Sequence, residues 1–334
     1  MPVIRRVRRA AVDLVAFAGV VVLFGCTPQT QLRGPTVQTP EVAVDHATMV
    51  DGARLPVWRW MPEGEMDAVV VALHGFTDYR RAFSDLGTHL ARRGIGVYAY
   101  DQRGFGGTAR RGIWPGTSLL VDDLVQVTEL VQKLHPKAKI FVLGESMGAA
   151  VVLVAMKRRD FPDISGAVLV APAVWGWGVM NPALAGLLRL LAHSAPWLPI
   201  SASEFRRLAS DNQAMLDALD QDPLVLQSVR VDALYGLVTL MDDALESATF
   251  LRPPTLVLYG ARERIIPRAA RDEFMGRLQA SQRVLIYPQG HHTLFRDLNA
   301  EVVLHEVASW IGEIIDSRSG GGVSPKNAVA TSRS

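Results

Sequence analysis

The sequence predicts an α/β protein in which helices cover both faces of a central, mostly parallel sheet. Two observations lead to this fold class. Short apolar runs alternate with segments of helical periodicity over residues 68–171 and again over 255–315, and such alternation is typical of right-handed βαβ units. The alternation stops after Pro172. We therefore expect a helical insertion between the two parts of one α/β core.

The most informative stretch for this fold surrounds Ser146. Residues 140–143 form a short apolar run, typical of a strand that is buried on both faces, and a helical pattern begins at Met147. Between them, Gly144 to Gly148 fits the pattern G-x-S-x-G. A serine on such a turn is lifted above the sheet edge, and the flanking glycines allow close backbone approach. The short pattern also occurs by chance, so the strand-turn-helix context is what predicts a nucleophile at Ser146.

The other elements follow in chain order. A hairpin is expected around Asp51-Gly52, with residues 55–60 as its second strand. Ser118 is expected to cap a helix. Further strands are predicted at 68–73, 95–100, 167–171, 255–259 and 283–287, and further helices at 81–93, 118–135, 268–278 and 299–315.

These elements divide the chain into a core, a cap and two end segments. Residues 45–172 and 251–316 form the predicted core. Residues 173–250 have helical periodicity and no convincing strand, so we expect a helical cap. Residues 317–334 are rich in Gly and Ser and low in apolar residues, which predicts a disordered tail.

Composition allows one large globular domain with an insertion. The chain has 334 residues, of which 49% are hydrophobic and 20% charged. Its formal net charge of +2 gives no indication of nucleic-acid binding, and its single cysteine excludes an internal disulfide.

The N-terminal region resembles a bacterial lipoprotein signal. Arginines 5, 6, 8 and 9 precede an apolar run at residues 14–25, and Cys26 follows. We expect residues 1–26 to be the signal, with Cys26 lipidated, and residues 27–44 to be a proline-bearing tether. This interpretation predicts a membrane-anchored lipoprotein of the bacterial cell envelope, facing the periplasm or the exterior. The alternative is an uncleaved membrane anchor in which the cysteine is incidental.

A nucleophilic serine needs a base, and the base needs a carboxylate that orients it. In this type of sheet the base follows the last strand. His291 and His292 both stand there. We favour His292, because the apolar pair Leu294-Phe295 follows it after one residue and can anchor the loop.

The carboxylate should follow the penultimate strand, where Glu263 is the only acidic residue of the turn. An ordinary surface ion pair with a neighbouring arginine is the alternative role for this side chain. Asp242, Asp243 or Asp272 could replace it only if the strand assignment is wrong.

An oxyanion formed during acyl transfer needs two backbone N–H donors. Met147, the residue after the serine, should supply one, and Phe76 in the loop after residues 68–73 should supply the other. His74 and Gly75 would shape that loop. His74 is a weaker candidate for the base, since the strand order puts the base last. This chemistry requires no cofactor and no metal.

Taken together, the motifs resemble the monoacylglycerol lipase and lysophospholipase group of α/β-hydrolases over about residues 45–315. They occur in the group's order and spacing: His74-Gly75-Phe76, Asp101 to Gly106, Gly144 to Gly148, Gly260 to Pro267, and His292-Thr293-Leu294-Phe295. The insertion resembles the group's cap through Ser210-Asp211 and Asp222-Pro223-Leu224.

The resemblance implies an α/β-hydrolase fold with Ser146 as nucleophile, Glu263 as acid and His292 as base. Two positions depart from the group's pattern. Glu263 stands where an aspartate is usual, and Phe105 stands where a histidine is common. We interpret Phe105 as structural.

The function predicted from these features is hydrolysis of carboxylic esters of the monoacylglycerol or lysophospholipid type through an acyl-enzyme. Lipid and, through the N-terminal anchor, a membrane are the expected partners. The apolar cap residues could line an acyl tunnel or touch a membrane. The alternatives are an acyltransferase or peptidase that uses the same triad, and a non-catalytic lipid-binding protein.

Overall fold

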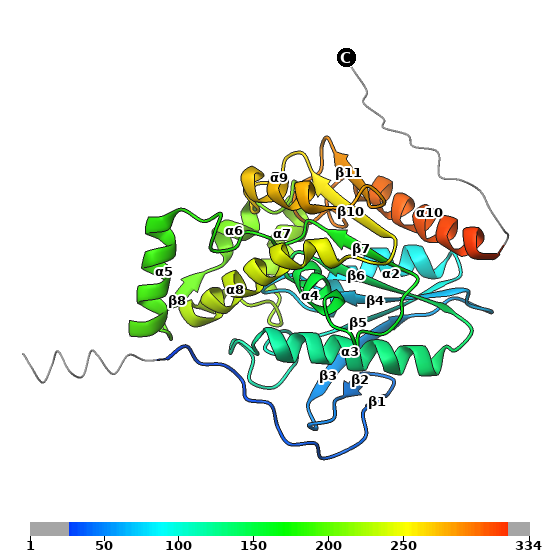
Figure 1. The fold of residues 1–334 in the computed structure, drawn as a ribbon, viewed down its shortest axis with the longest axis horizontal. Helices are drawn as coiled ribbons and strands as arrows, with labels where there is room; N and C mark the ends of the chain where they lie inside the picture. Colours follow the sequence, from blue (N-terminus) through cyan, green and yellow to red (C-terminus); the bar gives the residue numbers. More distant parts are fainter. Residues whose placement is uncertain (1–26, 320–334) are drawn as a thin grey trace, which may run out of the picture.

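The computed structural model describes residues 27–319 (Figure 1). The predicted signal with Cys26, and residues 320–334 of the predicted tail, lie outside the described residues. Within them, a nine-stranded sheet has the order β1-β2-β3-β5-β4-β6-β7-β10-β11. The antiparallel edge consists of β1 (Glu41–Val42), β2 (His46–Thr48) and β3 (Arg54–Trp60). The parallel part consists of β4 (Ala68–Leu73), β5 (Ile95–Tyr100), β6 (Lys139–Glu145), β7 (Gly166–Val170), β10 (Thr255–Gly260) and β11 (Arg283–Tyr287).

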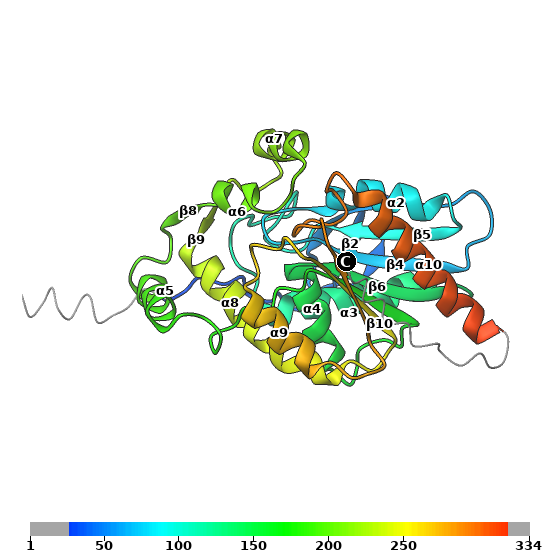
Figure 2. The ribbon, with the colours of Figure 1, turned by 90° about the horizontal axis from the view of Figure 1, so that it is seen from above.

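Helices cover both faces of this sheet, which confirms the predicted fold class (Figures 1 and 2). One face packs against α3 (Thr117–Leu134), α4 (Met147–Met156) and α9 (Arg268–Arg277). The other packs against η1 (Arg80–Phe83), α2 (Ser84–Ala91) and α10 (Ala300–Ser319). Strand β4 shows how the sequence serves both faces. Its side chains alternate between the two apolar clusters and all of them are buried.

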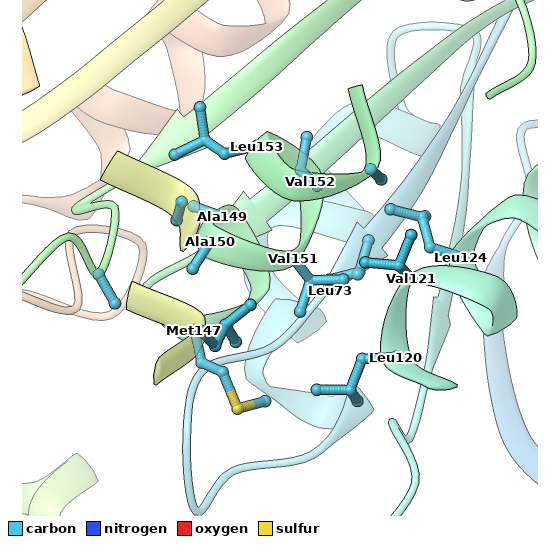
Figure 3. Packing of buried hydrophobic residues seen from close by; sticks show 14 of the residues in the cluster. Leu73, Leu120, Val121, Leu124, Met147, Ala149, Ala150, Val151, Val152 and Leu153 are labelled. Atoms are coloured by element: carbon cyan, nitrogen blue, oxygen red, sulfur yellow. The ribbon is translucent and has the colours of Figure 1, made fainter. Parts of the chain in front are cut away.

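Helix α4 is apolar on every side because other elements surround it. Met147 and Val151 lie toward Leu73 of β4, and the helix also packs against Leu120 and Leu124 of α3 (Figure 3). This packing fixes the start of α4, the point at which the predicted nucleophile stands.

The cap inserted between β7 and β10 contains α5 (Pro182–Ser194), α6 (Ser203–Arg207), α7 (Gln213–Gln221), α8 (Val231–Ser247) and η2 (Ala248–Phe250). It also contains a small antiparallel sheet of β8 (Pro199–Ser201) and β9 (Ser228–Arg230). The expectation of a cap without strands was therefore wrong, because a three-residue strand is too short to show an alternating pattern. Helix α8 packs on α4 and joins the cap to the core.

Several predicted boundaries also differ from the structure, and three of them bear on the assignment of elements. Helix α3 begins at Thr117, with Gly116 rather than Ser118 at its N-cap position. The helix expected over residues 81–93 is the pair η1 and α2. Helix α10 continues to Ser319, so residues 317–319 of the predicted disordered tail are helical.

Residues 27–38 lie against the domain and are called the strap below. The backbone N–H of Gln29 donates to Asp232 Oδ2 of α8 at 3.1 Å, and the backbone N–H of Gln31 donates to the Trp114 carbonyl at 2.9 Å. Arg33 forms an ion pair with Asp122 of α3. Farther along, residues 41–42 form β1. The predicted free tether over residues 27–44 is therefore wrong in this region, because its polar groups have partners on both core and cap.

Within residues 27–319, none of the helices has the combination of length and apolarity that a membrane span requires.

Candidate active site

Ser146 stands on the turn between β6 and α4 with φ 54° and ψ −114°. A non-glycine residue in this region is strained and persists only where its surroundings fix it. Here the Ser146 N–H donates to the Val170 carbonyl of β7 at 2.8 Å. The strained turn holds the serine at the carboxyl end of the parallel strands.

The two glycines of the motif are required by close backbone approach. A Cβ on Gly144 would overlap the backbone of Ala149, and one on Gly148 would overlap the carbonyl of Leu73. Gly75, in the loop after β4, faces Ser146 itself: a Cβ there would lie 3.4 Å from the Ser146 Cβ. The elements around Ser146 can therefore approach one another this closely only because glycines stand at their contact points.

His292 lies in the loop after β11, within hydrogen-bond distance of Ser146. The Ser146 hydroxyl donates to His292 Nε2 at 2.9 Å, and in that tautomer the Nδ1–H donates to Glu263 Oε2 at 2.6 Å. Leu294 and Phe295 are buried in the core and hold the loop. The structure therefore brings together the three residues that the sequence singled out.

Glu263 is buried in the turn after β10. Its Oε1 accepts from the backbone N–H groups of Ile265 at 2.6 Å and Ile266 at 3.1 Å. Burial by itself would raise the pKa of this carboxyl, but His292 and the two amides hold it below the ordinary value. The longer glutamate side chain, in a position where aspartate is usual in the resembled group, still reaches the imidazole.

The pKa of His292 is shifted upward, opposite to that of Glu263. Burial lowers it, but the charge and hydrogen bond of Glu263, together with the charge of Glu145, bring it above the ordinary value. A base with a raised pKa accepts a proton from a hydroxyl more readily.

The competing candidates lie elsewhere. His291 points toward Asp297, whose Oδ2 lies 3.5 Å from its Nδ1. His74 uses both ring nitrogens: Nδ1–H donates to the Gly75 carbonyl at 2.8 Å and Nε2 accepts from the Gln102 amide at 3.0 Å. The carboxylate that meets His292 is that of Glu263; Asp242 and Asp243 lie in α8, and Asp272 in α9.

The two predicted oxyanion donors lie beside Ser146. Met147 is the first residue of α4, so its N–H is among those that have no acceptor within the helix. Phe76 follows Gly75 in the loop after β4 and lines the same cavity as Ser146. This loop is held by a turn from the Asp78 N–H to the Gly75 carbonyl, with Thr77 at φ 72°.

A cavity of about 360 Å³ opens onto Ser146 and His292. Most of its wall comes from apolar side chains of the cap, including Trp175, Met180, Leu184, Leu187, Leu188, Leu191, Met215, Leu216, Leu219, Leu234 and Leu237. Leu184 and Leu187 of α5 are also exposed to solvent. The wall therefore reaches the outer surface at α5.

A known protein family matches most of the chain. Residues 64–299 match the model of the Hydrolase_4 family, described as serine aminopeptidase, S33. This match covers more than half of the chain. The chain belongs to this family.

The relatives of this Hydrolase_4 chain identify its group. It is 28% identical over 268 residues to a monoacylglycerol lipase of Mycolicibacterium smegmatis, covering 78% of this chain and 94% of that protein. It is also 28% identical over 296 residues to a monoglyceride lipase of Mus musculus, covering 84% and 94%. The predicted membership of the monoacylglycerol lipase group of α/β-hydrolases is confirmed.

Solved structures agree on the fold of the Hydrolase_4 chain. A soluble variant of the monoglyceride lipase of Saccharomyces cerevisiae, in complex with a substrate analog, superposes with a TM-score of 0.69 at 19% identity, covering 85% of this chain and 99% of that chain. The monoacylglycerol lipase of Paleococcus ferrophilus gives 0.66 at 22% identity, covering 78% and 98%.

Sequence reasoning missed a group of three charged residues that lies beside Ser146 in the cavity wall. Arg296 Nη2 lies 2.6 Å from Asp78 Oδ2 and 3.5 Å from Glu145 Oε2. Burial raises the pKa of Glu145 although Arg296 opposes this. Glu145 is part of the G-x-S-x-G pattern, and its charge in an apolar setting was the one available signal.

Residues 209–212 of the cap contact the loop after β11 that carries His291 and His292. The Ala209 carbonyl accepts from the amides of His292 at 3.0 Å and Thr293 at 2.9 Å. The Ser210 hydroxyl donates to Asp297 Oδ1 at 2.6 Å. Since both sides of this junction are buried, the position of His292 depends on the docked cap.

The same junction gathers Asp211, His291 and Asp297, whose possible ligand atoms lie within 4.8 Å of one another. No spacing in the sequence indicates this group, because Asp211 is far from the other two residues along the chain.

Proposed function

We propose that the chain is a serine hydrolase that cleaves carboxylic esters of lipid-like substrates, of the monoacylglycerol or lysophospholipid type, through an acyl-enzyme. One observation carries this proposal: Ser146, His292 and Glu263 form a continuous hydrogen-bonded chain at an apolar cavity. The names of its relatives, monoacylglycerol and monoglyceride lipases, support a lipid ester as substrate.

In the proposed acylation step His292 Nε2 takes the hydroxyl proton of Ser146 while Oγ attacks the ester carbonyl. The negative charge that develops on the carbonyl oxygen is stabilised by the N–H groups of Phe76 and Met147. The intermediate collapses, His292 returns the proton to the departing alcohol, and the acyl group stays on Ser146. Glu263 keeps the imidazole in the required tautomer and stabilises its protonated form.

In the proposed deacylation step, water replaces the alcohol. His292 removes one of its protons, hydroxide adds to the acyl carbonyl, and the fatty acid leaves as Ser146 regains its proton. No cofactor or metal has a part in this scheme. The apolar wall formed by the cap would hold the acyl chain during both steps.

An acyltransferase or a peptidase would use the same triad. The description of the family as serine aminopeptidase makes a peptidase the alternative to test. The wall of the cavity favours a lipid, because its cap side is almost wholly apolar. A peptide substrate would leave its backbone groups without hydrogen-bond partners there.

A fluorophosphonate probe and a substrate panel test this proposal. The probe should label Ser146 and no other residue, as read by mass spectrometry of the digested protein. The panel should run from a chromogenic short-chain ester through monoacylglycerols to lysophospholipids and aminoacyl amides. Labelling at another residue, or cleavage of amides in preference to every ester, would contradict the proposal. A lipid-binding protein without activity would give neither label nor product.

We also propose that Cys26 is lipidated and holds the enzyme at a membrane of the bacterial cell envelope, facing the periplasm or the exterior. The sequence supports this through the arginines, the apolar run and Gly25-Cys26. Each buried methylene contributes about 0.8 kcal/mol, so several acyl chains would anchor firmly. Metabolic labelling with a fatty-acid analogue should mark the wild type and not Cys26→Ser. Membrane retention of an unlabelled Cys26→Ser protein, with no label in the wild type, would support an uncleaved anchor instead.

A further inference from the structure

The loop after β4 carries the proposed oxyanion donor Phe76 directly before a strained residue. Thr77 has φ 72°, in the left-handed region that non-glycine residues rarely adopt. Such a backbone persists only where its surroundings fix it. An oxyanion donor must lie about 2.7–3.1 Å from the oxygen that gains charge. The contacts that fix Thr77 therefore also decide whether the Phe76 N–H is correctly placed.

The core holds this loop on one side. The Asp78 N–H donates to the Gly75 carbonyl at 3.3 Å, and Asp78 Oδ2 pairs with Arg296 Nη2 at 2.6 Å. Both contacts are made by Asp78, two residues beyond Phe76. They leave the carbonyl of Thr77 to another partner.

The cap holds the loop from the other side through two hydrogen bonds. The Leu226 N–H donates to the Thr77 carbonyl at 2.9 Å, and the Tyr79 hydroxyl donates to Asp222 Oδ2 at 2.6 Å. Burial and the hydrogen bond to Asp222 raise the pKa of Tyr79, so the hydroxyl keeps the proton that it donates. A hydroxyl that donates to a carboxylate at this distance forms one of the stronger hydrogen bonds in proteins.

The part of the cap that makes these bonds is itself fixed. Asp222 Oδ1 accepts from the Leu224 N–H at 2.8 Å, and the Asp222 carbonyl accepts from the Val225 N–H at 3.1 Å. The Leu226 carbonyl accepts from the buried guanidinium of Arg206 at 3.2 Å. Val225 and Leu226 are buried. This turn of the cap therefore gives the loop of Phe76 a firm support.

We propose that Tyr79 and Asp222 are positioning residues for the oxyanion hole, because their hydrogen bond ties the loop of Phe76 to the docked cap. Neither residue belongs to the described wall of the cavity at Ser146, so both would act through Phe76 without touching the substrate. The inference rests on the proposed function. It gives the cap a part in catalysis besides lining the cavity.

Tyr79→Phe tests the role, since it removes the hydroxyl and keeps the ring. For a chromogenic ester, kcat per site titrated with a fluorophosphonate should fall about 10-fold, less than the ~100-fold or more that follows loss of an oxyanion donor. KM should stay within about 2-fold of the wild type, because the loss is confined to the transition state. A fold defect alone would lower the number of titrated sites and leave kcat per site unchanged.

Two inhibitors separate the oxyanion hole from the rest of the cavity. A trifluoromethyl ketone forms a tetrahedral adduct with Ser146 that places an oxyanion in the hole, whereas an ether with the same alkyl chain does not. In Tyr79→Phe the Ki of the ketone should rise about 10-fold, in parallel with the fall in kcat, and the Ki of the ether should not change.

Tyr98→Phe is the matched control. Tyr98 is also buried, and its hydroxyl lies 2.8 Å from His135 Nε2, outside the wall of the cavity. This variant should leave kcat, KM and both Ki values unchanged. Asp222→Asn keeps the shape of the acceptor and should lower kcat less than Tyr79→Phe does. The double variant should be no worse than Tyr79→Phe, since both substitutions act on one hydrogen bond.

An unchanged kcat per titrated site in Tyr79→Phe, or a change in KM alone, would overturn the positioning role. An equal loss of kcat in Tyr98→Phe would do the same. Where Tyr79→Phe yields too little folded protein, Asp222→Asn decides: equal changes in the Ki of ketone and ether, or none, contradict the proposal. These outcomes leave the proposed function intact if the wild type cleaves esters. A wild type that cleaves no ester would overturn both.

Discussion

The core and the cap treat similar apolar side chains differently. Leu73 of β4 is 0% exposed, at the strand end that faces the nucleophile turn, whereas Leu187 and Leu190 of α5 are 51% and 65% exposed. The core therefore holds Ser146 and Glu263 by close packing, whereas the position of His292 also depends on its hydrogen bond to Ala209 of the cap. The cap supplies an apolar wall while leaving part of its own apolar surface in solvent. The difference indicates that the core positions Ser146 by packing, whereas α5 of the cap offers apolar surface that other parts of the chain do not cover.

The largest expected effect comes from removing the proposed nucleophile, which the core holds. Ser146→Ala should lower kcat for ester hydrolysis on the order of 10⁴-fold or more, because attack on the carbonyl is lost. The melting temperature should stay near that of the wild type, since alanine fits the same turn. Steady-state kinetics with a chromogenic ester and a thermal melt measure both. An active Ser146→Ala protein would refute the nucleophile.

The two histidines of one loop provide the next comparison. His292→Ala should be about as damaging to kcat as Ser146→Ala, and the double variant barely worse than either, because the two residues act as one unit. His291→Ala should be much milder, since its ring faces Asp297. The assignment of the base is wrong if His291→Ala proves the more damaging substitution.

Glu263→Gln should cost about 10 to 100 times less in kcat than loss of the serine, because the amide keeps the shape but stabilises the imidazolium poorly. The pH dependence of kcat/KM tests the same role of Glu263. Glu263 brings the pKa of His292 above 6.5, so wild-type kcat/KM should fall as pH decreases through a value above 6.5. In Glu263→Gln that midpoint should move to lower pH. An unchanged midpoint would show that another group sets it.

Two matched leucine substitutions test the contrast between core and cap directly. Leu73→Ala should lower the free energy of unfolding by about 2–5 kcal/mol, because it leaves a cavity in a packed interior. Leu190→Ala should change it by less than about 0.5 kcal/mol, as exposed positions usually do. Equilibrium urea denaturation measures both. Equal losses of unfolding free energy would contradict the contrast between the buried core leucine and the exposed leucine of α5.

Much of the proposed triad could be predicted from the sequence because its signals are local. Ser146 lies in a five-residue pattern between an apolar strand and a helix, and the buried Leu294-Phe295 pair marks His292. Glu263 followed from its place after β10. Strands β4, β5 and β10 were equally clear, since each is a largely apolar run that is buried on both faces.

The remaining features depend on contacts between distant parts of the chain. Asp78 and Arg296 come from two loops and Glu145 from the end of β6, and no spacing in the sequence indicates that the three meet. The strands of the cap are too short to show a period. The strap has the polar, proline-bearing composition of a free linker, and only its pairing with Trp114 and Asp232 shows otherwise.

The strap also limits how far the enzyme could stand from a surface. An extended chain with the length of residues 27–44 would reach about 60 Å. Because Gln29 is bound to Asp232 of the cap, a lipid on Cys26 would have only about 10 Å of chain before that attachment. The start of the strap lies near α5 in both views (Figures 1 and 2). Such a short connection would keep the half-exposed leucines of α5 at the level of the lipid headgroups. A lipid ester could then enter the cavity directly from the membrane surface.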